Sequence, residues 1–300
     1  MNDSARLTGR FEADRAHLRA VAHRMLGSAA EADDAVQETW LRLCRSDTDG
    51  VENLSGWLTT VVSRICLDML RTRESRREGP LETRESGGAL VPEGGSGTAP
   101  GRGPEEEALL ADTVGVAMLV VLDTLTPAER LAFVLHDMFA VSFDEIGTMI
   151  ERSPAAARQL ASRARRRVRG AGPAPGTDLP RRRRVVEAFL AATRGGDFEA
   201  LVALLHPDVV LRADPAAGPT PRPVVVLGAH TVAKGAMAAM GRARFTGPAL
   251  VDGTAGLVMA PLGRLFLVLR FEITDGLITG IEVIAEREHL GRLELAPFGD

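Results

Sequence analysis

Residues 141–169, VSFDEIGTMIERSPAAARQLASRARRRVR, predict two short helices joined by a tight turn. Ser142 and Glu145 have the spacing of a capping box, in which each residue bonds the other's backbone N–H. Ser153 can cap a second helix with Pro154 at its first position, where the missing N–H costs nothing. This is the layout of a helix-turn-helix, whose second helix enters a DNA major groove.

The second helix is basic on one side, because Glu151 is the only acid among the seven arginines that lie between residues 151 and 170. Its small apolar residues are expected to pack on the first helix. The residues expected to face outward and contact DNA are Arg158, Gln159, Ser162, Arg163 and Arg166. A solvated arginine-rich helix is the alternative, since charge alone does not separate the two interpretations.

The composition limits the partners and the compartment. The 300 residues suggest two or three domains, and a net charge of −4 means that any DNA contact must come from local basic patches. Cys44 and Cys66 lack metal-ligand spacing and are predicted to be reduced core thiols. Residues 114–122, the longest apolar run, are too short to span a bilayer, so we expect a soluble, cytoplasmic protein. No motif indicates a metal site or a cofactor.

The N-terminal part predicts three helices, over residues 11–27, 30–44 and 56–73, from apolar residues at helical spacing. The second helix has an outward acidic patch made of Asp33, Asp34, Gln37 and Glu38. The third helix becomes basic toward its end, with Arg64, Arg71, Arg73 and Arg76. Such a bundle indicates an adaptor between a protein and a nucleic acid, although each patch alone could be a solvated surface.

The rest of the chain alternates linkers and folded segments. Residues 79–104 are rich in Gly, Pro and Ser and predict a linker, after which helices over 104–125 and 126–138 lead into the helix-turn-helix. A second linker follows the last arginine of that motif. Beyond it, helices are predicted over about 185–195, 198–205 and 231–240, and strands over 209–212, 224–227, 257–260, 265–274 and 277–286. Asp275-Gly276 predicts a hairpin, and residues 206–208 predict a turn. The fold class is therefore two all-α domains followed by an α+β domain with a curved, largely antiparallel sheet.

Four quoted stretches resemble a known family. FEADRAHLRAVAHRMLGSAAEADDAVQETWLRL (11–43) and GWLTTVVSRICLDMLRTRESRRE (56–78) resemble region 2 of bacterial extracytoplasmic-function (ECF) sigma factors of the sigma-70 family. LDTLTPAERLAFVLHDMFAVSFDEIGTMIERSPAAARQLASRARRRV (122–168) is similar to their region 4. VVEAFLAATRGGDFEALVALLHPDVVLRAD (185–214) resembles the start of a SnoaL-like domain of the NTF2-like fold. This order is that of the sigma-J-type branch.

The resemblance implies a domain order and a partner for each domain. Region 2 would cover residues 8–78, a linker 79–104, region 4 residues 105–170, a second linker 171–180, and the SnoaL-like domain 181–300. The acidic patch would bind the clamp helices of the RNA polymerase β′ subunit. Arg64, Arg71, Arg73, Arg76 and Trp57 would hold the −10 promoter element as it melts. Region 4 would read the −35 element beside the polymerase β flap, through the five residues named above.

The resemblance also implies how the protein is controlled. The C-terminal domain would dock on regions 2 and 4 of its own chain and modulate promoter-specific initiation, so that a separate anti-sigma factor is not required. A tether of about ten residues would give such a domain a high effective concentration at its neighbours.

Two alternatives stay open at this stage. The chain could be a DNA-binding regulator that needs no polymerase contact. It could also be an isomerase or cyclase of the NTF2-like fold fused to a DNA-binding region, with acid–base chemistry from a few polar residues of the third domain. Those residues are His206, Asp208, Arg212, Asp214 and His230. Because fold alone does not carry activity, we expect no enzyme.

Overall fold

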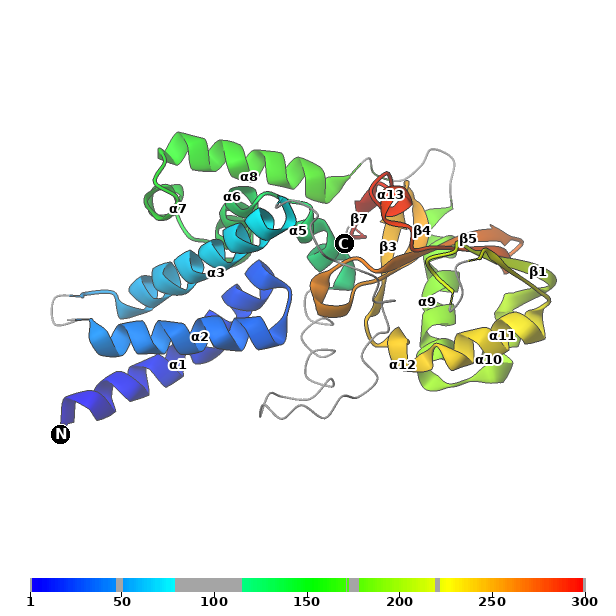
Figure 1. The fold of residues 1–300 in the computed structure, drawn as a ribbon, viewed down its shortest axis with the longest axis horizontal. Helices are drawn as coiled ribbons and strands as arrows, with labels where there is room; N and C mark the ends of the chain where they lie inside the picture. The colour runs from blue at the N-terminus through cyan, green and yellow to red at the C-terminus, as the bar shows by residue number, and fades with distance from the viewer. Residues whose placement is uncertain are drawn as a thin grey trace. The chain divides into compact units, whose positions relative to one another are not determined.

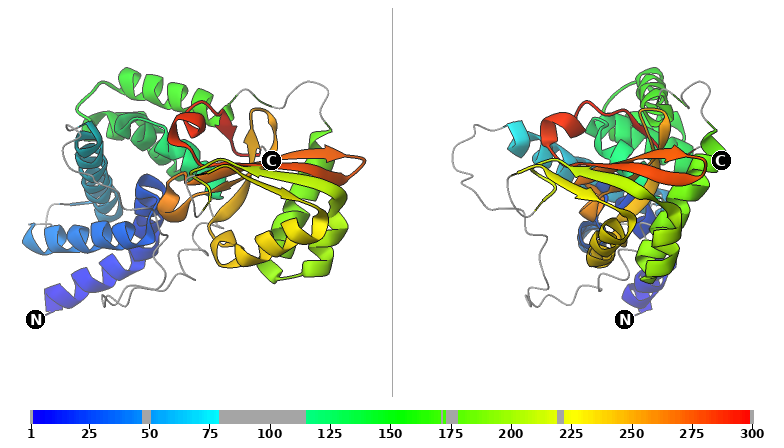
Figure 2. Two further views of the ribbon diagram at one scale, coloured as in Figure 1. Left: turned by 45° about the vertical axis from the view of Figure 1, so that its right-hand side comes forward. Right: turned by 90° about the vertical axis from the view of Figure 1, so that its right-hand side faces the viewer.

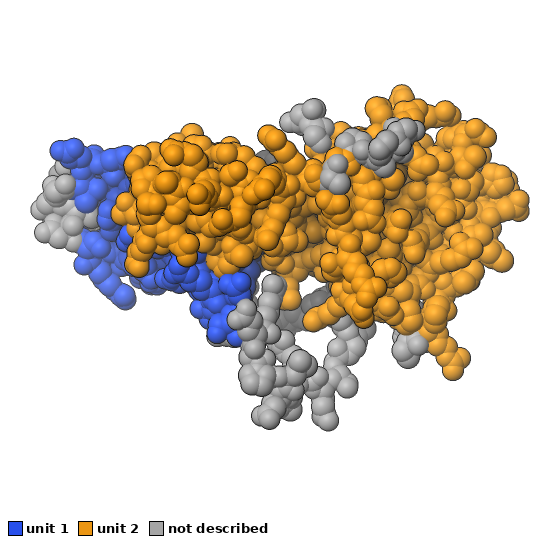
Figure 3. All heavy atoms as spheres, turned by 90° about the horizontal axis from the view of Figure 1, so that it is seen from above, with its two compact units in different colours: residues 1–107 blue, residues 108–300 orange. Residues whose placement is uncertain are grey.

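The computed structural model describes residues 2–46, 51–78, 115–170, 172, 178–218 and 222–298, with side chains from residue 7 onward and excluding those of 76–78. These residues form two compact units, residues 1–107 and 108–300 (Figure 3). The predicted linker over 79–104 lies outside the described residues, as does most of the second linker over 171–180.

The first unit contains the three predicted helices, α1 (Asn2–Leu26), α2 (Ala29–Arg45) and α3 (Leu54–Glu78) (Figure 1). Fully buried leucines from each helix, such as Leu18, Leu43 and Leu58, form its core. Cys66 is buried as predicted, whereas the prediction for Cys44 is wrong, because Cys44 is exposed. Successive helical residues are about 100° apart, so the neighbour of the core residue Leu43 points away from the core.

The second unit begins with a group of short helices. These are α5 (Val116–Asp123), α6 (Pro127–Phe133), a π-helical turn η1 (Val134–Met138), α7 (Phe143–Met149) and α8 (Pro154–Arg169). The predicted helix over 104–125 is described only from residue 116 on. The predicted helix over 126–138 is present, but its last turn is π-helical rather than α-helical.

A seven-stranded sheet forms the C-terminal part, with strand order β2-β1-β6-β5-β4-β3-β7. All neighbouring pairs are antiparallel except β1 and β6. The strands are β1 (Leu205–Ala213), β2 (Val224–Leu227), β3 (Thr246–Val251), β4 (Thr254–Met259), β5 (Leu267–Thr274), β6 (Leu277–Ile284) and β7 (Leu295–Ala296). The helical elements are α9 (Leu179–Gly195), α10 (Phe198–Leu204), α11 (Ala229–Ala238), α12 (Met240–Ala243), η2 (Pro261–Gly263) and α13 (Arg287–Leu290).

The hairpin prediction is confirmed, and two strand predictions are corrected. Asp275 and Gly276 join β5 to β6 with φ of 53° and 89°, as a type I′ turn requires. Residues 206–208, predicted as a turn, lie inside β1, where a register shift between Leu205 and Val210 forms a bulge that tolerates a proline. β3 was not predicted, because Gly247 and Pro248 are residues that disfavour a strand.

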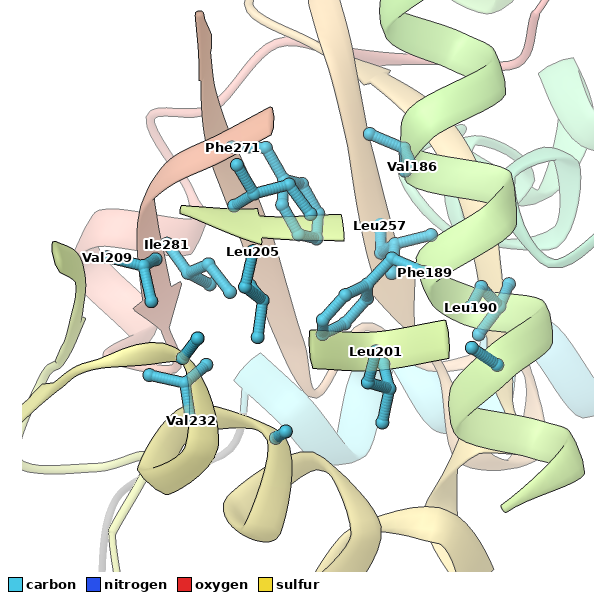
Figure 4. Packing of buried hydrophobic residues seen from close by; sticks show 14 of the residues in the cluster. Val186, Phe189, Leu190, Leu201, Leu205, Val209, Val232, Leu257, Phe271 and Ile281 are labelled. Carbon is cyan, nitrogen blue, oxygen red and sulfur yellow. The ribbon is translucent and has the colours of Figure 1, made fainter. Parts of the chain in front are cut away.

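Helices cover both faces of the sheet. On one face, α9, α10 and α11 pack on a core that includes Phe189, Leu201 and Phe271 (Figures 2 and 4). On the other face, α5 packs its apolar residues on β3, β4 and β5. Since side chains alternate along a strand, Leu257 of β4 points to the first face and Val258 to the second.

Candidate nucleic-acid and polymerase interfaces

The helix-turn-helix forms as its capping residues predict. Ser142 Oγ accepts a hydrogen bond from Glu145 N at 3.3 Å, and Glu145 Oε2 accepts from Ser142 N at 3.1 Å. Ser153 Oγ accepts from Ala156 N at the start of α8. A Cβ on Gly147 would lie 2.7 Å from Arg152 O, so glycine is required where α7 meets the turn. The local sequence therefore fixes the angle at which α8 leaves α7.

Helix α8 separates its residues into two faces, as predicted. Ala157, Leu160, Ala161, Ala164 and Val168 are buried against the neighbouring helices. Arg158, Gln159, Ser162, Arg163 and Arg166 are all exposed. The Arg158 guanidinium lies 5.2 Å from the centre of the Phe143 ring, and His136 stacks on that ring. An aromatic support of this kind holds an arginine without neutralising it.

Glu129 holds two α8 arginines to α6. Its side chain is 6% exposed and accepts from Arg163 Nε at 3.0 Å and from Arg167 Nη1 at 2.9 Å. It also completes a capping box with Thr126 at the start of α6. Burial opposes ionisation of Glu129, but the bonds from Arg163 and Thr126 and the charge of Arg167 outweigh it, so its pKa lies below the ordinary value. Arg163 therefore has a structural partner besides any DNA contact.

The acidic patch of α2 contains residues that pair within the first unit and residues that are exposed. Asp33 accepts from Arg19 Nε at 2.7 Å, which ties α2 to α1, and Glu38 pairs with Arg42 one turn away on α2. Asp34 and Gln37 are exposed, and no partner is found for either within the described part of the chain. Asp34 and Gln37 are thus the members of the patch that are available to another protein.

The basic end of α3 contains one arginine with a structural role. Arg73 Nη1 donates to Leu26 O at 3.2 Å, and Arg73 also pairs with Glu31 at the start of α2. Arg64 and Arg71 are exposed. Arg71 Nη1 lies 3.8 Å from Asp68 Oδ1 on the same helix, which is a long ion pair. Trp57 is half-buried near the start of α3. The side chain of Arg76 lies outside the described residues.

The polar residues weighed for enzyme chemistry do not converge on the cavity of the C-terminal domain. That cavity, of about 310 Å³, is lined by none of His206, Asp208, Arg212, Asp214 and His230. Asp214 instead accepts from four backbone N–H groups, those of Ala216, Ala217, Ala285 and Glu286, and so joins the end of β1 to the end of β6. Asp214 is therefore a structural carboxylate, although Glu286 and His289 lie close to it.

Three acidic residues that the sequence did not single out hold arginines in place, namely Glu31, Glu129 and Asp137. Asp137 Oδ1 accepts from Arg165 Nε at 2.7 Å. Glu129 contacts arginines that lie 34 and 38 positions further along the chain, and such distant contacts leave no local pattern. No helix in the described part of the chain is long and apolar enough to cross a membrane.

Comparisons with known proteins agree with this geometry. The family models of sigma-70 region 2 and sigma-70 region 4 match residues 11–76 and 116–168. The probable ECF RNA polymerase sigma factor SigI of Mycobacterium tuberculosis is 35% identical over 222 residues, which are 74% of this chain and 73% of that protein. The chain belongs to the ECF RNA polymerase sigma factors. It therefore belongs to a family of proteins that bind RNA polymerase core and promoter DNA and direct promoter-specific initiation.

SigJ is a further relative of this chain. The ECF RNA polymerase sigma factor SigJ of M. tuberculosis is 44% identical over 206 residues, 68% of this chain and 64% of SigJ, so the match spans less than two thirds of that relative. A crystal structure of M. tuberculosis SigJ, 32% identical, covers 95% of this chain and 98% of that chain with a TM-score of 0.44. The predicted α+β domain with a largely antiparallel sheet is confirmed. The family is one of sigma factors and not of enzymes.

Proposed function

We propose that this sigma factor works in the cytoplasm as a promoter-specificity subunit with a built-in regulatory domain. Residues 8–78 act as region 2, residues 105–170 as region 4 and residues 181–300 as the regulatory domain. Linkers over 79–104 and 171–180 join them. The exposed face of α8 is the single observation that carries the proposal, because it offers cations and hydrogen-bonding groups that point away from the protein core.

In this proposal, α8 reads the −35 element with Arg158, Gln159, Ser162 and Arg166 beside the polymerase β flap. These four residues are exposed, and neither Arg158 nor Arg166 has an acidic partner within the described residues. Arg163 contributes as well, but its bond to Glu129 limits its reach. An arginine that bonds a guanine edge with both nitrogens would give base specificity, whereas contact with phosphate alone would not.

Region 2 would bind the clamp helices of β′ through α2 and the −10 element through α3. Support comes from exposed Asp34 and Gln37 on α2, and from exposed Arg64 and Arg71 on α3. Asp33 and Glu38, Arg73 and Arg76, and Trp57 complete the two proposed surfaces. Charged rims of this kind speed association and select partners more than they add affinity.

A charge reversal tests polymerase contact and separates this proposal from a regulator that binds DNA alone. Asp34→Arg should lower affinity for purified core RNA polymerase by at least tenfold and leave binding of free promoter DNA unchanged. Glu52→Arg is the matched control, since Glu52 is exposed and lies outside α2. Equal affinity of the two variants for core polymerase would favour the regulator without polymerase contact.

The C-terminal domain would modulate region 4 through α5. Val116, Ala117 and Val120 of α5 are buried against the face of the sheet formed by Ala249, Val258 and neighbouring residues. α5 also contacts α8, and α8 contacts β7. Because the regulatory surface is part of the same chain, no separate anti-sigma factor is needed to supply it. Docking on region 2 is part of the same proposal.

Two glycine variants test this docking. A Cβ on Gly247 would lie 2.9 Å from Val116 Cβ, whereas a Cβ on Gly241 would meet nothing within 4 Å. Gly247→Ala should therefore loosen α5 from the sheet and change the transcript yield with core polymerase, by at least twofold, while Gly241→Ala should not. Identical transcript yields from the two variants and the unmodified chain would rule out control through α5.

A further inference from the structure

The C-terminal domain contains an apolar cavity of about 310 Å³ between the sheet and the helices α9, α11 and α12. Its inner wall includes Phe189 from α9, Val232 from α11, and Leu257 and Ile281 from the sheet, whose side chains point toward one another in Figure 4. Small-molecule sites are usually concave, mostly apolar and supplied with a few polar groups, and this volume is near the lower end of their range.

Two arginines lie at the cavity, one on α12 and one on α9. Among the described residues that line it, Arg242 is the only titratable one, and its exposure places it at the mouth. No acidic partner of Arg242 is found in the described ranges of the chain. Arg194 adds a second positive charge at this end, because its guanidinium donates to Ala243 O at 3.1 Å and to Thr246 O, and both residues line the cavity.

The other polar side chains among the described lining residues are Thr193, Thr231 and Thr246, and a threonine offers no acid or base. Thr193 Oγ1 donates to Phe189 O at 2.8 Å and Thr246 Oγ1 donates to Arg242 O at 3.4 Å, so both hydroxyl hydrogens are engaged by backbone carbonyls. Acid–base chemistry requires a titratable group within hydrogen-bond reach of the reacting proton. An arginine keeps its charge at any ordinary pH and serves as an anion anchor instead.

We propose that this cavity binds a hydrophobic monocarboxylate, with its chain or ring inside and its carboxylate at Arg242. An apolar body matches the lining, and burying it is favourable in proportion to the area removed from water. A carboxylate matches a guanidinium that has no acidic partner, because charge-assisted hydrogen bonds are among the stronger polar contacts. The C-terminal domain is then a receptor for a small molecule.

The position of the cavity relates it to region 4. Thr246, Leu257, Met259 and Leu267 line the cavity, while alternate residues of the same strands, including Val258, pack with α5. A bound ligand and α5 thus contact opposite faces of the same three strands. The proposed ligand site depends on the cavity and not on control of region 4, so ligand binding can be measured without polymerase.

Calorimetric titration of the full chain with decanoate, and with decanol as its uncharged counterpart, tests the proposal. Decanoate should bind at least tenfold more tightly than decanol. Arg242→Gln should lower that preference, whereas Arg244→Gln should keep it in full, since Arg244 does not line the cavity and lies over the Phe245 ring. The charge-neutralising pair is matched because both arginines are exposed.

A cavity-filling variant locates the site. Ala236→Phe places a ring where Ala236 lines the cavity, and it should abolish binding of both probes while the unfolding transition stays cooperative. Absence of decanoate binding at millimolar concentration would overturn the proposal. Equal loss in the Arg242 and Arg244 variants, or full binding to the filled variant, would also overturn it.

Discussion

Helices α8 and α3 both carry exposed arginines, yet the two helices neutralise them differently. On α8, the acids that pair with Arg163, Arg165 and Arg167 belong to α6 and η1. Arg158 and Arg166 have no acidic partner within the described residues. On α3, Arg73 pairs with an acid of α2, whereas Arg71 has only a loose contact with Asp68 on its own helix.

The difference shows that the element carrying the acid decides the role of an arginine. An acid on a different helix holds its arginine as part of the fold, and the loss of that pair changes stability. An exposed acid on the same helix holds it weakly, since surface pairs contribute only about 0–1 kcal/mol. The following predictions test this distinction, beginning with the largest expected effect.

Glu129→Ala should destabilise the second unit by roughly 2–4 kcal/mol, because it removes a buried acid that caps α6 and pairs with two arginines. The half-exposed Arg163 and Arg167 can return to water, which keeps the loss below that of a fully buried pair. Glu129→Gln should cost less than Glu129→Ala, since glutamine preserves the capping box. Chemical denaturation measures both values, and equal stability of all three proteins would contradict this role.

The Glu129 contribution should depend on pH in a defined direction. Its pKa is lowered in the folded protein, so its contribution is complete above the ordinary carboxyl pKa of about 4.3 and is lost as the pH falls through the lower folded value. The stability difference between the unmodified chain and Glu129→Gln should therefore be constant near neutral pH and shrink in acid. A difference that grows as the pH falls would contradict the assignment.

Arg166→Ala should weaken binding to the −35 element by about 1–3 kcal/mol if the side chain bonds a base edge. Stability should change little, because Arg166 is exposed and has no acidic partner within the described residues. Arg287→Ala, at an exposed arginine of the C-terminal domain, is the control. Promoter binding measured over several salt concentrations distinguishes base from phosphate contact, and unchanged binding would remove Arg166 from the interface.

Arg73→Gln should destabilise the first unit by about 1 kcal/mol, since it removes the bond to Leu26 O and the pair with Glu31. Arg71→Gln should change stability by less than about 0.5 kcal/mol, as expected for a surface pair. Thermal unfolding compares the two variants directly. If Arg71→Gln costs as much as Arg73→Gln, the distinction between the two helices fails.

The sequence alone predicted what depends on local patterns. Capping residues placed α7 and α8, apolar spacing placed α1 to α3, and Asp275-Gly276 placed a hairpin. The pairing of Glu129 with Arg163 and Arg167 could not be predicted, because it joins residues far apart in the chain. β3 was missed because Gly247 disfavours a strand when only its neighbours in the sequence are considered. Glycine is needed there because the distant Val116 packs on that position. The faces of α8 were predictable, but the neutralisation of its arginines was not.

Run-off transcription with purified core polymerase and a promoter library tests the central claim most directly. The full chain should direct initiation from promoters that share a −35 element, and the double variant Arg158→Ala with Arg166→Ala should lose that selection while still binding core polymerase. Transcripts that start at the same sites with and without this protein would contradict the account. So would transcripts from the double variant that start at the same sites as those from the unmodified chain.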